Sequence, residues 1–297
     1  MKQIVLFAAL VAGLFVLGHS QNLVNNPGFE TNSGCPTGPC QWNRATGWNN
    51  INGGAGCGSY GTPDYFHTCG GGFSHLPYNG YLTCNPHGGN AVMGFLTWSG
   101  SLSSNWREYV SQQLLSPMMI GQNYTVSFWI CNAFNPYYGG GSNHIGLDFH
   151  TAPHTQAVAG VVSLVPEYEI PGVFFSNSWV NFTFNITPTA AWQYITFGNF
   201  YNDASTTAQV FDAGAAYFRA YYFIDDISIV TSVVFPLEMS APKIAAANMG
   251  SQVTWEATAS EGIATYTVER TTGPSQPYDV VGSVPANVID GETQQYS

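Results

Sequence analysis

Alternating hydrophobic and polar positions recur along the chain from about residue 91, and this pattern predicts β-strands. Apolar side chains at every second residue lie on one face of a strand, while the polar ones between them lie on the other face. Turn residues separate these segments, and no long amphipathic helix pattern is present. We therefore predict an all-β chain whose main domain is an antiparallel β-sandwich of the jelly-roll type. The predicted strands span residues 124–130, 145–150, 180–186, 194–200 and 220–230.

The last of these segments, AYYFIDDISIV, carries two adjacent carboxylates inside a run of residues that favour strands. Alternation predicts that Phe223, Asp225, Ile227 and Ile229 share one face, which we interpret as the core face. A buried carboxylate is costly unless it is hydrogen-bonded, paired or bound to a cation. We therefore expect Asp225 to have a specific partner.

The first twenty residues have the features of a signal peptide. Lys2 is followed by an apolar run, 4–17, that is too short to span a membrane, and small residues precede a predicted cleavage site near Ser20/Gln21. No later stretch is long and apolar enough to span a bilayer. We therefore expect a secreted or cell-surface protein whose main domain covers residues 21–232.

Residues 31–90 are rich in glycine, asparagine and proline and hold most of the cysteines. In an exported chain, such spacings favour disulfides that staple loops without a core of their own. Six cysteines allow 15 connectivities, and Cys35 with Cys40 is the simplest local pair. Cys131 lies in a predicted strand, paired or simply buried. The disulfide candidates are Cys35, Cys40, Cys57, Cys69, Cys84 and Cys131.

A structural zinc site is the alternative for this segment, because His67, His75 and His87 are interleaved with its cysteines. The segment contains no CxxC, HxxxH or HExxH spacing, so disulfides are the preferred interpretation.

The pattern of hydrophobic and turn residues changes after residue 232. Residues 233–240 form a predicted linker, and short strand-like runs separated by turn residues follow within 241–297. An immunoglobulin-like sandwich needs about seven strands and more residues than remain here. We therefore expect a second, smaller and incomplete β domain, and a chain that is a fragment of a longer one.

The amino-acid composition limits the classes of ligand that this chain can bind. Only 8% of the residues are charged, 15% are aromatic and the net charge is -11. Such a chain repels phosphate backbones, which excludes nucleic acid as a ligand. The polar surface has to come from neutral side chains, which suits a neutral polysaccharide or glycan as partner; cell-surface proteins are a second possibility.

Two segments resemble the first and last strands of carbohydrate-binding modules of the family 4/9 type, within the galactose-binding-like jelly-roll superfamily. They are NLVNNPGFE (22–30) and YYFIDDISIV (221–230). The order of the motifs between them is similar to that of exported Bacteroidetes proteins, which often end in a sorting signal for type IX secretion. Residues 236–270 resemble a fibronectin-type-III-like domain. The motifs in between lie at 62–66, 89–91, 106–110, 143–146 and 194–200.

The resemblance implies a structural calcium ion, Ca2+, where the first and last strands meet, with Glu30 and one of Asp225 or Asp226 as side-chain ligands. Calcium takes six to eight oxygen ligands, and carboxylates brought together from distant positions repel unless a cation lies between them. We prefer Asp225, because alternation turns it inward with Ile227 and Ile229. Alternatively, these acids only accept backbone N–H bonds at the edge of the sheet.

Sugar sites combine flat aromatic faces with amides or carboxylates that bind hydroxyls. For each candidate the alternative is structural, because a tryptophan in a β-sandwich is often core and Arg107 with Glu108 can simply pair with neighbours. The ligand-binding candidates are Trp48, Tyr60, Asp64, Tyr65, Asn90, Trp98, Trp106, Arg107 and Glu108.

Catalysis is disfavoured by the motifs. Hydrolysis of a glycoside needs two carboxylates facing each other across a cleft, and no motif assigns any carboxylate such a role. GxSxG, HExxH and a phosphate-binding glycine loop are all missing from the sequence. Two hypotheses are left: a non-catalytic glycan-binding module, or a structural or adhesive surface domain without a small ligand.

Overall fold

The computed structural model describes residues 7–11, 21–52, 61–79, 82–102, 104–133, 136–231, 238–247, 250–258, 265–271, 279–285 and 293–296. The chain divides into two compact units, one of residues 21–232 and the other of residues 1–20 with 233–297. The described residues form strands and two short 3-10 turns, with no α-helix among them. The prediction of an all-β chain is confirmed.

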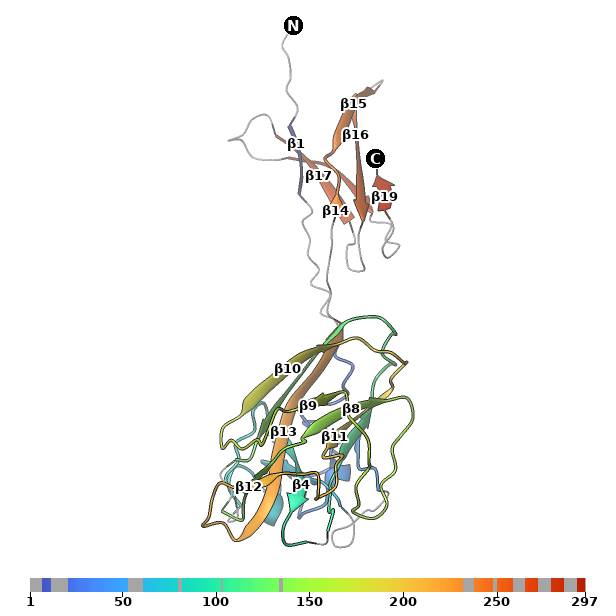
Figure 1. Cartoon of the computed structure of the whole chain (residues 1–297). Coiled ribbons are helices and arrows are strands. Elements are labelled where there is room, and N and C mark those ends of the chain that lie inside the picture. The colour runs from blue at the N-terminus through green and yellow to red at the C-terminus, as the bar shows by residue number, and fades with distance from the viewer. Residues whose placement is uncertain are drawn as a thin grey trace. The chain divides into compact units, whose positions relative to one another are not determined.

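The first unit contains a seven-stranded sheet, in which the long strand β13 is central (Figure 1). Its main path runs β10-β6-β13-β4-β3, all antiparallel; β7 pairs in parallel with β13 and antiparallel with β12. The strands are β3 (Asp64–His67), β4 (Ala91–Ser99), β6 (Tyr124–Cys131), β7 (Tyr138–Ser142), β10 (Val180–Ile186), β12 (Ala208–Val210) and β13 (Tyr217–Thr231).

The second sheet of this unit has five antiparallel strands in the order β2-β5-β11-β8-β9. They are β2 (Trp48–Asn49), β5 (Val110–Gln113), β8 (Gly146–His150), β9 (Tyr168–Glu169) and β11 (Tyr194–Gly198); the 3-10 turns are η1 (Trp42–Arg44) and η2 (Gly72–Ser74).

The main core lies between the two sheets, because the alternating apolar side chains of both point into one cluster. In β6, Val126, Phe128 and Ile130 are buried there, and Ile195 and Phe197 of β11 meet them from the other sheet. A second, smaller cluster covers the opposite face of the seven-stranded sheet. This two-layer packing is the predicted jelly-roll sandwich.

A β-bulge in β13 changes which face the predicted core residues occupy. Asp225 pairs with Trp129 and Ser228 with Ser127, so two residues of β13 oppose one of β6. Asp226 sits in the bulge at φ 48°. Alternation therefore resets within the strand, and Phe223 lies in the second cluster, while Ile227 lies in the main core.

The prediction that Phe223, Asp225, Ile227 and Ile229 share one face is therefore wrong. Asp225 is fully buried, as expected, but on the side of Phe223 rather than that of Ile227.

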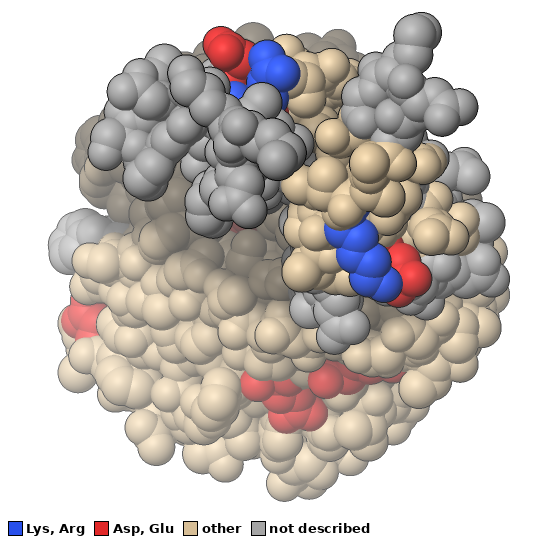
Figure 2. All heavy atoms as spheres, turned by 90° about the horizontal axis from the view of Figure 1, so that it is seen from above, with Lys and Arg blue, Asp and Glu red and all other residues tan. Residues whose placement is uncertain are grey.

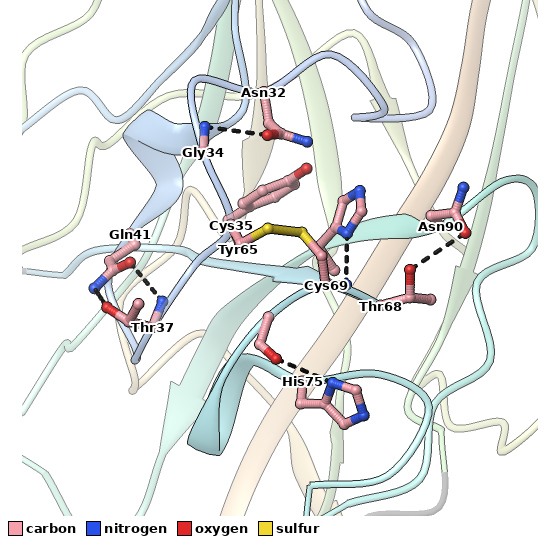
Figure 3. The surroundings of a disulfide bond; sticks show 12 residues. Asn32, Gly34, Cys35, Thr37, Gln41, Tyr65, Thr68, Cys69, His75 and Asn90 are labelled. Atoms are coloured by element: carbon pink, nitrogen blue, oxygen red, sulfur yellow. Dashed lines mark hydrogen bonds between the residues drawn. A yellow bond between two sulfur atoms is a disulfide. The ribbon is translucent and has the colours of Figure 1, made fainter.

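One disulfide joins Cys35 to Cys69 (Figure 3). It ties the loop after residue 31 to the chain just after β3. Within that loop, Asn32 Oδ1 accepts a hydrogen bond from the N–H of Gly34. The local pairing of Cys35 with Cys40 is therefore wrong. Cys40 is also disulfide-bonded, and Cys57 lies outside the described residues.

Cys84 and Cys131, two of the predicted disulfide candidates, are buried free thiols in the second cluster. Their sulfur atoms lie close enough to hydrogen-bond.

The second unit consists of two small sheets. One has the order β1-β17-β18, and the other joins β14, β15 and β19 to β16. Because β1 pairs with β17, cleavage near Ser20/Gln21, which stays a prediction, would remove a strand of this unit. The strands are β1 (Phe7–Val11), β14 (Glu238–Met239), β15 (Lys243–Ala247), β16 (Gly250–Thr258), β17 (Thr265–Thr271), β18 (Asp279–Pro285) and β19 (Thr293–Tyr296).

Charged side chains are few on the face of the molecule seen in Figure 2, as the composition requires. No helix among the described residues is both long and apolar enough to cross a membrane.

Candidate functional site

A group of polar and aromatic side chains gathers on the face of the seven-stranded sheet that carries the second cluster. We call it the acidic–aromatic site and define it by Asp64, Glu108, Tyr138, Arg219 and Tyr221. Arg219 and Tyr221 alternate along β13, and β3 and β7 bring Asp64 and Tyr138 to the same place. The rings of Tyr138 and Tyr221 lie 5.2 Å apart.

Asp64 is held at the first position of β3 by two donors. Its Oδ2 accepts a hydrogen bond from the Tyr221 hydroxyl at 2.6 Å, and its Oδ1 accepts one from the N–H of Cys40 at 2.5 Å. Burial raises the pKa of the Asp64 carboxyl to about 6, although both donors act in the opposite direction. Asp64 is therefore an oriented acceptor that gains a proton in mildly acidic solution.

Glu108 is the second carboxyl of the site. Its Oε2 accepts a hydrogen bond from the N–H of Leu96 at 2.9 Å. Burial, and then the charge of Asp64, raise the pKa of the Glu108 carboxyl well above its usual range, while Arg219 acts to lower it. Burial therefore favours the protonated form of Glu108, which can donate a hydrogen bond, next to Asp64, which can accept one.

The Arg219 guanidinium lies between two tyrosine rings, 5.2 Å from the ring centre of Tyr138 and 4.7 Å from that of Tyr217. Its Nε donates to Ser101 Oγ at 2.9 Å. Among the described residues it forms no ion pair, so its charge is balanced by aromatic faces and by the nearby acids. Tyr217 is 44% exposed.

Trp106 lies beside the Glu108 carboxyl and packs against the second cluster. Its buried indole N–H makes no hydrogen bond of normal geometry among the described residues. The site therefore combines aromatic rings, two carboxyls, a cation and an indole N–H beside Glu108. This set suits a neutral ligand with many hydroxyl groups.

Of the sequence-predicted ligand residues, the structure brings together Asp64, Glu108 and Trp106. For three others the predicted ligand-binding role is corrected, because their side chains are buried elsewhere in the fold. Trp48 is in the main core with its indole N–H on Asn26 O, and Tyr65 is in the same core with its hydroxyl on Phe29 O. Arg107 is fully buried and pairs with Asp203 at 2.9 Å, which is the structural alternative considered for it.

Two of the remaining three also lie away from the site. Trp98 packs against the main core, with Phe218 at 4.7 Å. Asn90 donates its backbone N–H to Glu30 Oε1 at 2.7 Å. Tyr60 lies outside the described residues.

The sequence interpretation missed Tyr138, Tyr217, Arg219 and Tyr221. A signal for three of them was available, because residues 217, 219 and 221 alternate along β13 and therefore share a face. Nothing in the sequence places Tyr138 opposite them, since that depends on the parallel pairing of β7 with β13.

The predicted calcium ligands form a second group, the Gly28 carboxylate cluster, defined by Glu30, Asp225 and Asp226. A Cβ atom added to Gly28 would lie 3.1 Å from Asp226 Oδ1, 3.5 Å from Asp225 Oδ1 and 3.9 Å from Glu30 Cγ. The three acids thus converge on one glycine from segments almost two hundred residues apart. A Cβ on Gly88 would also come within 2.6 Å of Asp226 Oδ2.

Backbone donors satisfy much of this cluster. Asp225 Oδ2 accepts from the N–H groups of His87 and Gly88 at 3.0 and 3.1 Å, and Glu30 Oε1 accepts from that of Ala91 at 3.0 Å. Burial raises the pKa of Asp225 to about 8. Asp226 Oδ2 lies 2.6 Å from His87 Nδ1. The contacts of Asp225 and Glu30 match the alternative in which these acids accept backbone N–H bonds.

Comparison with known proteins gave structural similarities only. No family model matches the chain, and no curated protein matches it. Solved structures of low similarity include the K1 cleaved adhesin domain of Lys-gingipain from Porphyromonas gingivalis W83, with 14% identity, a TM-score of 0.35, and coverage of 69% of this chain and 96% of that one.

The CBM22-1 xylan-binding domain of Paenibacillus barcinonensis Xyn10C has 10% identity, a TM-score of 0.34, and coverage of 71% and 95%. The tandem CBM22-1–CBM22-2 domain of the same protein has 11% identity, a TM-score of 0.36, and coverage of 93% and 83%. TM-scores of this size assign no function, which has to come from the site itself.

Proposed function

We propose that the first unit is a non-catalytic glycan-binding module of an exported or cell-surface protein, and that the acidic–aromatic site binds the glycan. One observation carries the proposal: the buried carboxyls of Asp64 and Glu108 adjoin Arg219, whose guanidinium lies 4.7 Å from the ring centre of the exposed Tyr217. Pyranose rings present C–H faces that pack on aromatic rings, while their hydroxyls both donate and accept hydrogen bonds. The low charge of the chain favours a neutral glycan.

The test is a screen of the full chain for retention on neutral polysaccharides and for binding to an array of neutral oligosaccharides. Tyr217→Ala should weaken binding of the retained glycan by roughly 10-fold or more, because an aromatic contact of this kind contributes about 1–2 kcal/mol. Glu108→Gln keeps the shape of the side chain but changes its donor pattern, and it should weaken binding as well.

Tyr194→Ala is the matched control, because Tyr194 lies on the five-stranded sheet, away from the site. It should bind like the wild type. Retention of no glycan by the wild-type chain would favour the alternative, a structural or adhesive domain. Release of sugar products that stops with Glu108→Gln would instead indicate a hydrolase.

We further propose that the Gly28 carboxylate cluster binds a structural Ca2+ ion. In support, three carboxylates converge on Gly28, and the Asp226 carboxylate approaches Gly28 and Gly88 so closely that a Cβ would lie 3.1 Å and 2.6 Å from its oxygens. Glu30, Asp225 and Asp226 would hold the ion, whose positive charge would offset the repulsion among the three carboxylates.

Chelation should therefore lower the melting temperature of the full chain, and added calcium should restore it. Asp226→Asn should remove this sensitivity, whereas Asp212→Asn, which changes an exposed aspartate of the same unit, should retain it. Equal melting temperatures of the wild type with and without chelator would contradict the calcium proposal and leave the glycan proposal unaffected.

A further inference from the structure

The outer face of the five-stranded sheet, which points away from the main core, carries a line of buried polar side chains. Ser111, Asp148, His150 and Thr196 come from the three adjacent strands β5, β8 and β11, and all are almost inaccessible to solvent. Asp148 and His150 are two residues apart on β8 and therefore share this face. Buried polar groups need partners, so this face has to satisfy them locally.

The chain turns after β8 and returns His154 to the same place. His154 Nε2 lies 2.6 Å from Asp148 Oδ2, and the rings of His150 and His154 stack with centres 3.9 Å apart. One ligand atom from each of Asp148, His150 and His154 lies within 4.8 Å of the others. Three potential metal ligands thus converge from a segment of only seven residues.

The hydrogen bonds of His150 orient it as a ligand. Its Nδ1 lies 2.7 Å from the carbonyl oxygen of Ala152 and donates to it. In this tautomer Nε2 carries a lone pair, which faces the Thr196 hydroxyl at 2.8 Å. Thr196 has a second acceptor in Ser111 Oγ at 2.9 Å, so it can release His150 without losing its own bond. A histidine ligand typically donates its other N–H to a carbonyl in this way.

A further carboxyl adjoins the group. Glu167 Oε2 accepts the N–H of Phe149 at 2.7 Å, and the Glu167 carboxyl is within hydrogen-bonding reach of Asp148. Two adjacent acids on a largely buried face repel one another unless a proton or a cation lies between them. The group is not closed to solvent, because the His154 side chain is 22% exposed.

We propose that Asp148, His150 and His154 bind a divalent transition-metal ion, with zinc as the preferred ion. Two imidazoles and one carboxylate match the ligand preferences of zinc and of neighbouring metals, whereas calcium prefers oxygen ligands alone. The ion would tie the segment after β8 to the sheet and keep a coordination position open on the His154 side. The spacing His150-x-x-x-His154 is present in the sequence but lies outside the cysteine-rich segment considered for zinc.

The competing explanation is a simple ion pair between His154 and Asp148, and the chain contains a matched example of one. His144 Nδ1 lies 2.6 Å from Glu169 Oε2, and the two side chains are exposed to a similar degree, but the described part of the chain places no second histidine beside them. His144→Asn is therefore the control for His154→Asn.

The experiment uses the full chain, stripped with chelator and returned to metal-free buffer, with Zn2+ and Co2+ as probes. Zinc binding is measured by calorimetry, and cobalt binding by its visible absorption spectrum, which reports nitrogen and oxygen ligands directly. Circular dichroism establishes that each variant is folded. Asp148→Asn serves as a second ligand variant in case the histidine variant does not fold.

We expect one Zn2+ per chain, and a cobalt spectrum that zinc displaces. His154→Asn and Asp148→Asn should weaken binding by about 100-fold or more, beyond the ~10–100-fold typical of an outer-shell partner, and His144→Asn should bind like the wild type. The proposal is overturned if the wild-type chain binds no stoichiometric zinc, or if His154→Asn and His144→Asn bind equally well.

Discussion

Asp64 shows how one side chain links stability to the chemistry of the proposed glycan site. Its carboxyl is almost completely buried, and its pKa rises from 3.8 to about 6. The folded state holds this proton more tightly than the unfolded chain does. The contribution of Asp64 to the free energy of unfolding is therefore greatest below about pH 4 and falls as the pH rises toward 6. A pKa change of this size corresponds to a loss of about 3 kcal/mol from this residue.

We expect denaturant titrations of the wild type to show this loss between pH 4 and 6, and Asp64→Asn to show a smaller one. A wild-type stability that rises over the same range as steeply as in Asp64→Asn would contradict the assignment of Asp64 as a buried acid with a raised pKa.

Tyr221→Phe tests the same pair from the donor side. The hydroxyl that donates to Asp64 at 2.6 Å is lost, which should cost about 1–2 kcal/mol and raise the pKa of Asp64 further. The pH range in which stability falls should therefore extend to higher pH than in the wild type. Tyr109→Phe removes another buried tyrosine hydroxyl, which bonds to Asn199 O, and should leave that range unchanged.

Asp225 shows what could be predicted for one residue and what could not. A carboxylate inside an apolar strand indicates burial and a specific partner, and both are found. Its direction could not be predicted, because it depends on the bulge at Asp226, which resets the alternation. A single residue at positive φ outweighs a period-two pattern in this strand.

At the scale of elements, the strands with the clearest alternation of apolar and polar residues are predictable from the sequence. The alternating segments 124–130 and 180–186 become β6 and β10, which pair along their whole length with apolar side chains turned toward the main core. The loops are different, because their positions depend on long-range contacts. The Cys35–Cys69 bridge and the placement of Tyr138 beside Tyr221 have no local signal.

Cys84 and Cys131 offer a test of packing between a loop and a strand. The two thiols lie in contact inside the second cluster, and the residues are 47 positions apart in the chain. Mild oxidation should therefore join them without moving the backbone far. In the chain-entropy description, closing a loop of this length stabilises the fold by about 4 kcal/mol.

Peptide mass mapping under non-reducing conditions should find the Cys84–Cys131 bridge together with a higher melting temperature, and Cys84→Ser should show neither. If both thiols can still be alkylated after oxidation and denaturation, the contact between them is wrong.

At the scale of the whole molecule, composition and pattern were enough to predict an all-β jelly roll and a second, smaller β unit. The candidate site was only partly predictable. Asp64, Glu108 and Trp106 were candidates from residue type alone, whereas Trp48, Tyr65 and Arg107 have the same residue chemistry but are buried elsewhere. Aromatic side chains form both cores and sugar platforms, so only the fold separates the two roles.

The central claim is that the acidic–aromatic site binds a neutral glycan. The most direct measurement is a crystal structure of the full chain with an oligosaccharide that it retains in the screen. The expected result is a sugar ring packed against Tyr217 or Trp106, with a hydroxyl bonded to Glu108 or Asp64. A sugar bound on the outer face of the five-stranded sheet, with the acidic–aromatic site vacant, would contradict the account.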